Sequence, residues 1–131
     1  MYVERTSDGW TFRFREPGVA QLQIDFRFSL LVGDGALIVI EEPFVLRHDE
    51  TEVLVPPGGD GSEVGAALPL FGQEITAATA SSSGELHIQF GNGATASVPV
   101  NPAYENWQIV LSDGQQWIGL PGGGVTYITG K

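Results

Sequence analysis

Several residue types that define common protein classes are missing or scarce in this sequence. It has no cysteine, which excludes disulfides, thiol nucleophiles and thiolate metal sites. Asp and Glu total 16 while Lys and Arg total 6, Lys131 is the only lysine, and the formal net charge is -10. Nucleic-acid affinity depends on basic side chains that contact phosphates. The sequence therefore argues against nucleic acid and anionic membranes as partners, whereas a basic protein is electrostatically compatible.

Long apolar runs are also missing. No stretch approaches the roughly 18 residues that a membrane-spanning helix needs, and the first ten residues, MYVERTSDGW, lack the basic-then-apolar pattern of a secretion signal. The expected location is the cytoplasm.

What the sequence does contain is a two-residue alternation typical of strands. Apolar residues occupy every second position from Leu22 to Leu30, and 18 glycines and 8 prolines mark frequent turns. The 131 residues predict a single β-rich domain, 1–131. The predicted fold is all-β, made mainly of antiparallel hairpins in a sandwich or a partly open barrel, with one short helix near 61–70. Asp60 and Glu63 are spaced to form a capping box for that helix.

Matching of apolar faces predicts how these strands pair. A three-residue loop at Glu16-Pro17-Gly18 would pair residues 10–14 with 20–24. The same loop type at Gly33-Asp34-Gly35 and Gly91-Asn92-Gly93 would set Ile38 against Leu30 and Ala96 against Ile88. The likeness of these last two segments suggests an internal hairpin duplication, about 20–45 and 80–102. The predicted inward-facing residues are Phe12, Phe14, Leu22, Ile24, Phe26, Phe28, Leu30, Ile88 and Phe90; the predicted outward-facing ones are Arg13, Gln23, Arg27, Glu85 and His87.

A second apolar face is expected on the first of these two hairpins. Leu31, Leu37 and Val39 share the side opposite the core, where contiguous apolar patches are rare on monomers. Two covers are considered: the segment Val64–Leu70, which we favour, or a second copy of the chain in a homodimer.

The stretch Asn106 to Gly124, NWQIVLSDGQQWIGLPGGG, is rich in glycine but lacks the features of a phosphate-binding loop. No Lys-Ser or Lys-Thr follows the glycines, and a strand-like segment follows where a phosphate loop needs a helix. A β-meander fits better. With Asp113-Gly114 as a two-residue turn, Trp117 would pair with Val110, and Trp107 and Trp117 would lie on opposite faces.

Three motifs carry a family resemblance: Pro102-Ala-Tyr-Glu-Asn-Trp107, Ser-Asp-Gly114 and Leu120-Pro-Gly-Gly123. They resemble the C-terminal signature of a family of small uncharacterised bacterial proteins, common in actinobacteria, that runs Tyr-Glu-x-Trp, a glycine turn, then Pro-Gly-Gly. Ile24 to Phe28 and Leu70-Phe71-Gly72 resemble its other parts. The resemblance implies no activity and no catalytic residue.

Polar clusters provide few candidates for chemistry. Glu41-Glu42 and the segment His48 to Glu52 hold carboxylates and an imidazole, but their spacing matches no metal-binding loop, and Asp49-Glu50 is typical of a turn. His87 is expected to face Ser97 across a hairpin, a nucleophile–base pair without the surrounding motif of a hydrolase. We assign no catalytic, cofactor or metal residue.

Three functions are compatible with this sequence. The one we favour is a non-enzymatic acidic module that binds a basic protein, of the immunity or accessory type, with Tyr104, Glu105 and Trp117 as recognition residues. The second is a small-molecule or carbohydrate binder, which would need Trp117 and Tyr104 to line one concave site. The third is a metal-assisted or hydrolytic enzyme using His48 or His87.

Overall fold

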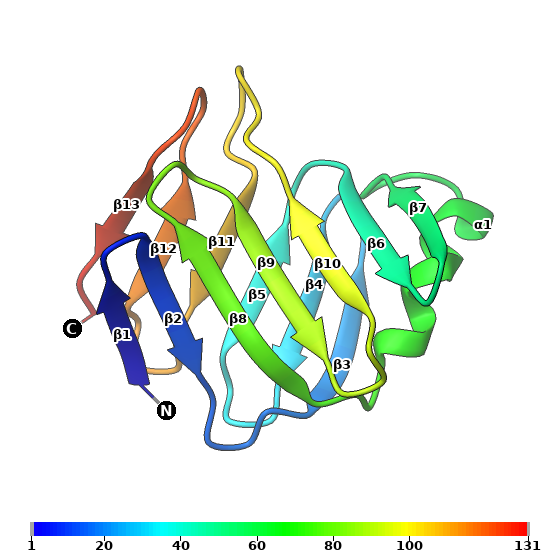
Figure 1. The fold of residues 1–131 in the computed structure, drawn as a ribbon, viewed down its shortest axis with the longest axis horizontal. Coiled ribbons are helices and arrows are strands. Elements are labelled where there is room, and N and C mark those ends of the chain that lie inside the picture. Colours follow the sequence, from blue (N-terminus) through cyan, green and yellow to red (C-terminus); the bar gives the residue numbers. More distant parts are fainter. Residues whose placement is uncertain (1, 131) are drawn as a thin grey trace.

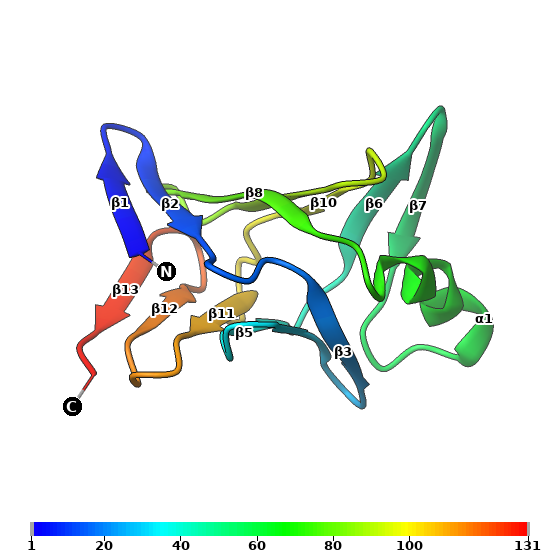
Figure 2. The ribbon, with the colours of Figure 1, turned by 90° about the horizontal axis from the view of Figure 1, so that it is seen from below.

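The chain folds into two antiparallel β-sheets packed face to face, as the computed structural model shows for residues 2–130 (Figures 1 and 2). The sheets are separate, so the fold is a sandwich. The seven-stranded sheet has the spatial order β1 (Tyr2–Thr6), β2 (Gly9–Arg13), β8 (Ile75–Ser81), β9 (Leu86–Phe90), β10 (Thr95–Val98), β6 (Phe44–His48) and β7 (Thr51–Val55). The six-stranded sheet has the order β13 (Val125–Ile128), β12 (Gln116–Gly119), β11 (Trp107–Val110), β5 (Leu37–Ile40), β4 (Phe28–Val32) and β3 (Val19–Ile24).

The expected helix forms next to β7, where α1 (Gly61–Val64) runs into the 3-10 helix η1 (Gly65–Leu70). Figure 2 shows this segment at one end of the sandwich. Its buried residues Val64, Ala67 and Leu70 join the core between the sheets. Our expectation that this segment covers the outer face of Leu31, Leu37 and Val39 was therefore wrong, because its apolar side is used to close the end of the core.

Asp60 holds the start of α1 through the predicted capping box. Its Oδ1 accepts from the backbone N–H of Glu63 at 2.9 Å and from Ser62 Oγ at 2.7 Å, while Glu63 Oε1 accepts from the Asp60 N–H at 3.4 Å. These bonds, from Ser62 first and from the Glu63 backbone second, lower the pKa of Asp60 below its ordinary 3.8. The carboxylate form is thus the one that the folded chain stabilises.

Asp60→Ala is expected to lower the melting temperature by a few degrees at pH 7, because the helix loses its N-terminal acceptor. The pKa of Asp60 is lower in the folded state than in the unfolded state. The stabilisation that its carboxylate provides is therefore fully present above pH 3.8, and it is lost as the pH falls through the lower folded-state pKa. Thermal unfolding followed by circular dichroism from pH 7 to pH 2 tests both points. A gap between parent and variant that stays constant down to the lowest pH would contradict this assignment.

Five hairpins turn with the same three-residue loop. In each, the third loop residue is a glycine with positive φ whose N–H donates to the carbonyl of the residue just before the loop, a geometry that disfavours other residues. These glycines are Gly35, Gly84, Gly93, Gly114 and Gly123. The loops at Gly35 and Gly93 confirm the predicted pairs Leu30–Ile38 and Ile88–Ala96. Because three further hairpins use the same loop, the internal duplication stays a prediction.

The loop at Gly114 corrects the predicted register of the last meander. Three residues rather than two form the turn, so Val110 pairs with Gln116, and Trp117 pairs with Ile109. Trp107 and Trp117 consequently share the inner face, and both are buried. The one-residue change moved the second tryptophan from one side of the sheet to the other.

The predicted first hairpin was also wrong. β2 pairs with β1 and β8 in one sheet, whereas β3 pairs with β4 in the other, so the chain crosses between sheets after Arg13. Alternation identifies a strand but not its partner. The five polar residues predicted to face outward are all exposed, and most of the predicted core is buried or half-buried. Ile24 and Phe26 are the exceptions, because β3 is an edge strand that ends in an exposed turn.

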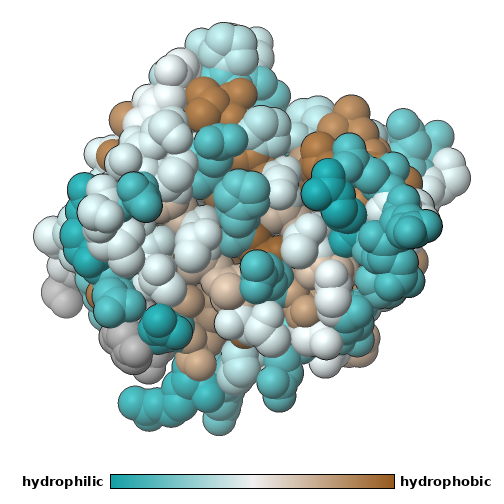
Figure 3. All heavy atoms as spheres, in the orientation of Figure 1, coloured by the Kyte–Doolittle hydropathy of each residue, from teal (hydrophilic) through white to brown (hydrophobic). Residues whose placement is uncertain are grey.

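The outer face of the seven-stranded sheet is largely polar (Figure 3). Hydrophilic and neutral residues predominate in that view, and the hydrophobic residues form separate small patches. The features of greater functional interest lie at the ends of the sandwich, where loops and sheet edges meet.

Candidate functional site

Tyr104 and Glu105 lie in a shallow hollow of about 500 Å³ formed by loops of the six-stranded sheet. The loop before β11 supplies both residues. The turn between β3 and β4 adds Phe26 and Arg27, the segment after β5 adds two carboxylates, and the β12–β13 turn closes one side. The full lining is Phe26, Arg27, Glu41, Glu42, Ala103, Tyr104, Glu105 and Pro121. Figure 1 shows the β10–β11 loop and the β12–β13 turn projecting together at one end of the sandwich.

The loop that carries Tyr104 is ordered by Asn101. The Asn101 side-chain oxygen accepts the backbone N–H groups of Ala103 at 2.8 Å and Tyr104 at 2.9 Å. Its amide nitrogen donates to Glu42 Oε1 at 2.6 Å, and its backbone oxygen accepts from Gly122. An asparagine that caps local N–H groups in this way favours one loop conformation. These bonds fix the loop backbone at Tyr104 and tie it to Glu42 through the Asn101 side chain.

Two aromatic side chains on this hollow face water. Phe26 is 90% exposed and Tyr104 is 66% exposed. Such exposure contributes little to folding, so an aromatic residue held in this way is typical of a binding surface. Three carboxylates, from Glu41, Glu42 and Glu105, lie in the same hollow with one cation, Arg27, giving it a net negative charge.

Tyr104 and Glu105, the candidates from the sequence, line this hollow together with Phe26, which we had placed in the core. The overlooked signal is Asp25, whose Oδ1 accepts the backbone N–H of Arg27 at 2.7 Å and so forms a turn. Aspartate commonly makes this two-residue bond and breaks strands. The alternating row from Leu22 to Leu30 thus contains a reversal at its centre.

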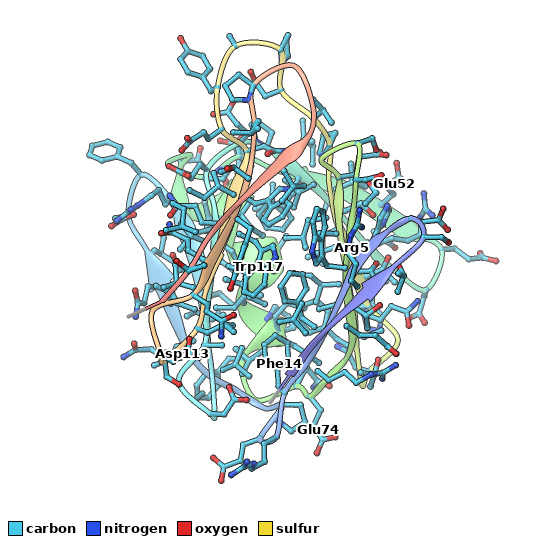
Figure 4. All side chains as sticks on the ribbon, turned by 90° about the vertical axis from the view of Figure 1, so that its left-hand side faces the viewer. Arg5, Phe14, Glu52, Glu74, Asp113 and Trp117 are labelled. Carbon is cyan, nitrogen blue, oxygen red and sulfur yellow. The ribbon has the colours of Figure 1, made fainter. Side chains whose placement is uncertain are left out.

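Trp117, the third predicted recognition residue, lies apart from Tyr104. It is 4% exposed and lines a separate cleft of about 490 Å³ at the open end of the sandwich, between β1–β2 and β12–β13. Figure 4 looks into this end, with Arg5 and Trp117 on opposite sides of the gap between the sheets. The lining residues are Val3, Arg5, Trp10, Leu111, Asp113, Gln115, Trp117 and Tyr127. Trp117 and Tyr104 thus line different hollows, whereas the second function considered for the sequence would need them in one concave site.

The Trp117 indole has an unusual hydrogen-bonding state. Its Nε1 is buried, yet it has no acceptor among the described residues. The Trp107 Nε1, by contrast, donates to Gly84 O at 2.9 Å. Leaving a buried N–H without an acceptor costs roughly 1–3 kcal/mol, and such groups are rare in folded proteins.

The histidines lie outside both hollows just described. His87 Nδ1 is 3.0 Å from Ser97 Oγ, as the predicted strand pairing requires, on the exposed outer face of the seven-stranded sheet. His48 Nε2 lies 3.1 Å from Asn92 O, and Asp49 adopts the positive φ of a tight turn, as the sequence indicated. Within residues 2–130 no group of three or more His, Asp or Glu side chains is arranged to hold a metal ion.

Fold and site together define a two-sheet β-sandwich that carries an acidic, aromatic hollow on its loops. Within that class, the chain belongs to the family of unknown function DUF6188, whose model matches residues 10–129. This confirms the expected membership of an uncharacterised family. No curated protein and no solved structure matches the chain. Among the described residues, no helix has the length and apolarity needed to cross a membrane.

Proposed function

We propose that this protein is a non-enzymatic binding module that captures a basic segment of a partner protein in the hollow of Phe26, Tyr104 and Glu105. The observation that carries this proposal is the pair of exposed aromatic rings beside three carboxylates. A lysine or arginine offers a positive head and an apolar stem, and this combination of rings and carboxylates is complementary to both.

The charge of the whole chain supports the same partner chemistry. With a formal net charge of -10, the protein attracts basic partners over long range and repels acidic ones. Long-range attraction raises the association rate but does not select one geometry. Selection is the role we assign to the aromatic rings, because their contacts act only at short range.

The test uses a fluorescein-labelled peptide of alternating glycine and arginine as the probe, with binding measured by fluorescence anisotropy. Phe26→Ser and Tyr104→Ser are each expected to weaken binding about 5- to 10-fold, the loss of one ring-to-cation contact. Glu105→Gln should weaken it less and should reduce its dependence on salt.

The matched control is Phe71→Ser, which removes another exposed aromatic ring, 60% exposed, outside this hollow. It leaves the charge of the protein unchanged, as do the two aromatic test variants. Binding that is equally insensitive to all three substitutions would reduce the interaction to non-specific attraction and would refute the hollow as the site.

A further inference from the structure

The cleft at the open end of the sandwich, lined by Trp10, Trp117 and Tyr127, has features of a second binding site. Trp117 lies at its buried side, while Trp10 from β2 and Tyr127 from β13 add aromatic rings from both sheets. Trp117 packs edge-on against Phe12 at 5.2 Å between ring centroids and is stacked at a tilt on Tyr127 at 4.7 Å. A concave space of about 490 Å³ lies within the range that small ligands occupy.

The polar groups of the cleft are held in place by the protein itself. Arg5 lies over the Trp10 ring, 4.4 Å from its centroid, and donates to Gly9 O at 2.8 Å. On the opposite sheet, Asp113 Oδ2 accepts from Gln115 Nε2 at 2.7 Å. The Tyr127 hydroxyl extends this chain by donating to Gln115 Oε1 at 2.8 Å. These contacts pre-organise the cleft before a ligand arrives.

Charge narrows the class of ligand. The backbone and side-chain N–H groups of Gln115 lower the pKa of Asp113, so this carboxyl is ionised at neutral pH. The positive Arg5 and the negative Asp113 are the charged residues of the lining, and they balance. A strongly cationic ligand would be repelled by Arg5 and a strongly anionic ligand by Asp113. A neutral ligand therefore fits this cleft better.

The Trp117 indole N–H, which has no acceptor, indicates a second property of the ligand besides its neutral charge. The buried Trp117 Nε1 has no acceptor among the described residues and almost no surface open to solvent, so a ligand oxygen that displaces the side chains over it would satisfy a donor that folding leaves unmatched. The ligand should therefore carry oxygen acceptors as well as a flat apolar face for Trp10 and Tyr127. A planar heterocycle would need two parallel aromatic rings between which it could insert. The rings of Trp117 and Tyr127 are already in contact with an angle of 38° between their planes, so they leave no such space.

We infer that this cleft binds a neutral pyranose sugar, with an oxygen of the ring or its hydroxyls accepting from Trp117 Nε1 and the C–H face packed on Trp10 or Tyr127. A pyranose combines apolar C–H faces with hydroxyls around its edge, and the Asp113 carboxylate in the lining is an acceptor to which such hydroxyls can donate. This site is separate from the hollow of Phe26 and Tyr104, and no residue lines both.

The experiment follows the indole N–H signals in ¹H–¹⁵N spectra while methyl β-D-glucopyranoside, methyl β-D-galactopyranoside or methyl α-D-mannopyranoside is added. The chain has three tryptophans and so gives three such signals. At least one sugar is expected to shift the Trp117 signal downfield in a saturable way, with a Kd of about 1–10 mM for a single sugar ring. The Trp107 signal serves as an internal control, because its N–H is already bonded to Gly84 O.

Two variants complete the test. Trp10→Ala is expected to weaken sugar binding at least 5-fold by removing an aromatic wall, while Tyr104→Ser, in the other hollow, should leave it unchanged. If no sugar shifts the Trp117 signal up to the limit of solubility, the proposal is overturned. A saturable shift with free indole but with none of the sugars would also overturn the assigned ligand class. Because the peptide assay uses different residues, neither result affects the proposed protein-binding function.

Discussion

Gly119→Ala is expected to lower the free energy of unfolding by more than about 3 kcal/mol, a large part of the stability of an ordinary domain. A Cβ at position 119 would lie 2.0 Å from Asn106 Oδ1 and 2.6 Å from Trp107 Nε1. Neither group has room to withdraw. Asn106 is fully buried and donates to Pro99 O at 2.6 Å and to Gly84 O at 3.1 Å, while Trp107 donates to the same Gly84 oxygen.

The expected loss is large because these contacts join the two sheets. Gly84 is in the β8–β9 turn of the seven-stranded sheet, whereas Trp107 begins β11 of the six-stranded sheet. Displacing Trp107 or Asn106 would break the hydrogen bonds between these layers and leave polar groups unmatched in the core.

Gly65→Ala is the matched control for this experiment. Gly65 has an ordinary helical φ of -56° and no atom within 4 Å of a Cβ, so alanine there should be neutral or slightly stabilising. Urea unfolding followed by tryptophan fluorescence measures both variants. A Gly119→Ala protein whose unfolding midpoint equals that of the parent would show that Asn106 and Trp107 can relax and that the junction is not rigid.

The second large effect concerns the two core tryptophans. Trp107→Phe is expected to cost about 2–4 kcal/mol, and Trp117→Phe about 1–2 kcal/mol less than that. Both substitutions remove similar apolar volume from the interior. Only the first removes a hydrogen bond, because Trp107 Nε1 donates to Gly84 O while Trp117 Nε1 has no acceptor among the described residues.

Urea unfolding followed by far-ultraviolet circular dichroism is suited to this comparison, because both variants alter the tryptophan signal. Equal losses for the two variants, or a larger loss for Trp117→Phe, would mean that the Trp117 N–H is satisfied in solution. That outcome would also remove the orphan donor on which the sugar-binding proposal relies. A smaller loss for Trp117→Phe would provide a folded protein in which the sugar titration can be repeated.

The two proposed sites place different demands on the fold. The hollow of Phe26 and Tyr104 is made of loops, and its shape is set by Asn101 and by the Asp25 turn. The cleft of Trp10 and Trp117 is lined by strands β1, β2, β12 and β13 and by the β11–β12 turn. A change in the loop of Tyr104 can therefore alter the first site without disturbing the second.

The sequence by itself determined the all-β class, the short capped helix, the glycine turns and the strand pairs Leu30–Ile38 and Ile88–Ala96. These are local properties: alternation, capping residues and loop length act over fewer than about ten residues. Tyr104 and Glu105 were recognisable as loop residues for the same reason. The predictions failed at two kinds of position. At Gly114 a turn one residue longer than expected placed Trp117 on the other face of the sheet, and at Asp25 an aspartate formed a turn within a continuous alternating pattern.

Only the tertiary structure decided which strands are neighbours outside these local hairpins and which residues line the same hollow. β2 pairs with β1 and β8 rather than with β3, the partner we expected. The alternation of apolar residues predicts which face of a strand is buried, but it does not predict the sheet to which the strand belongs. Phe26 lines the same hollow as Tyr104, and Trp117 the same cleft as Trp10, although these segments are far apart in the chain. Their proximity depends on how the strands are ordered and packed, and no single segment of the sequence encodes it.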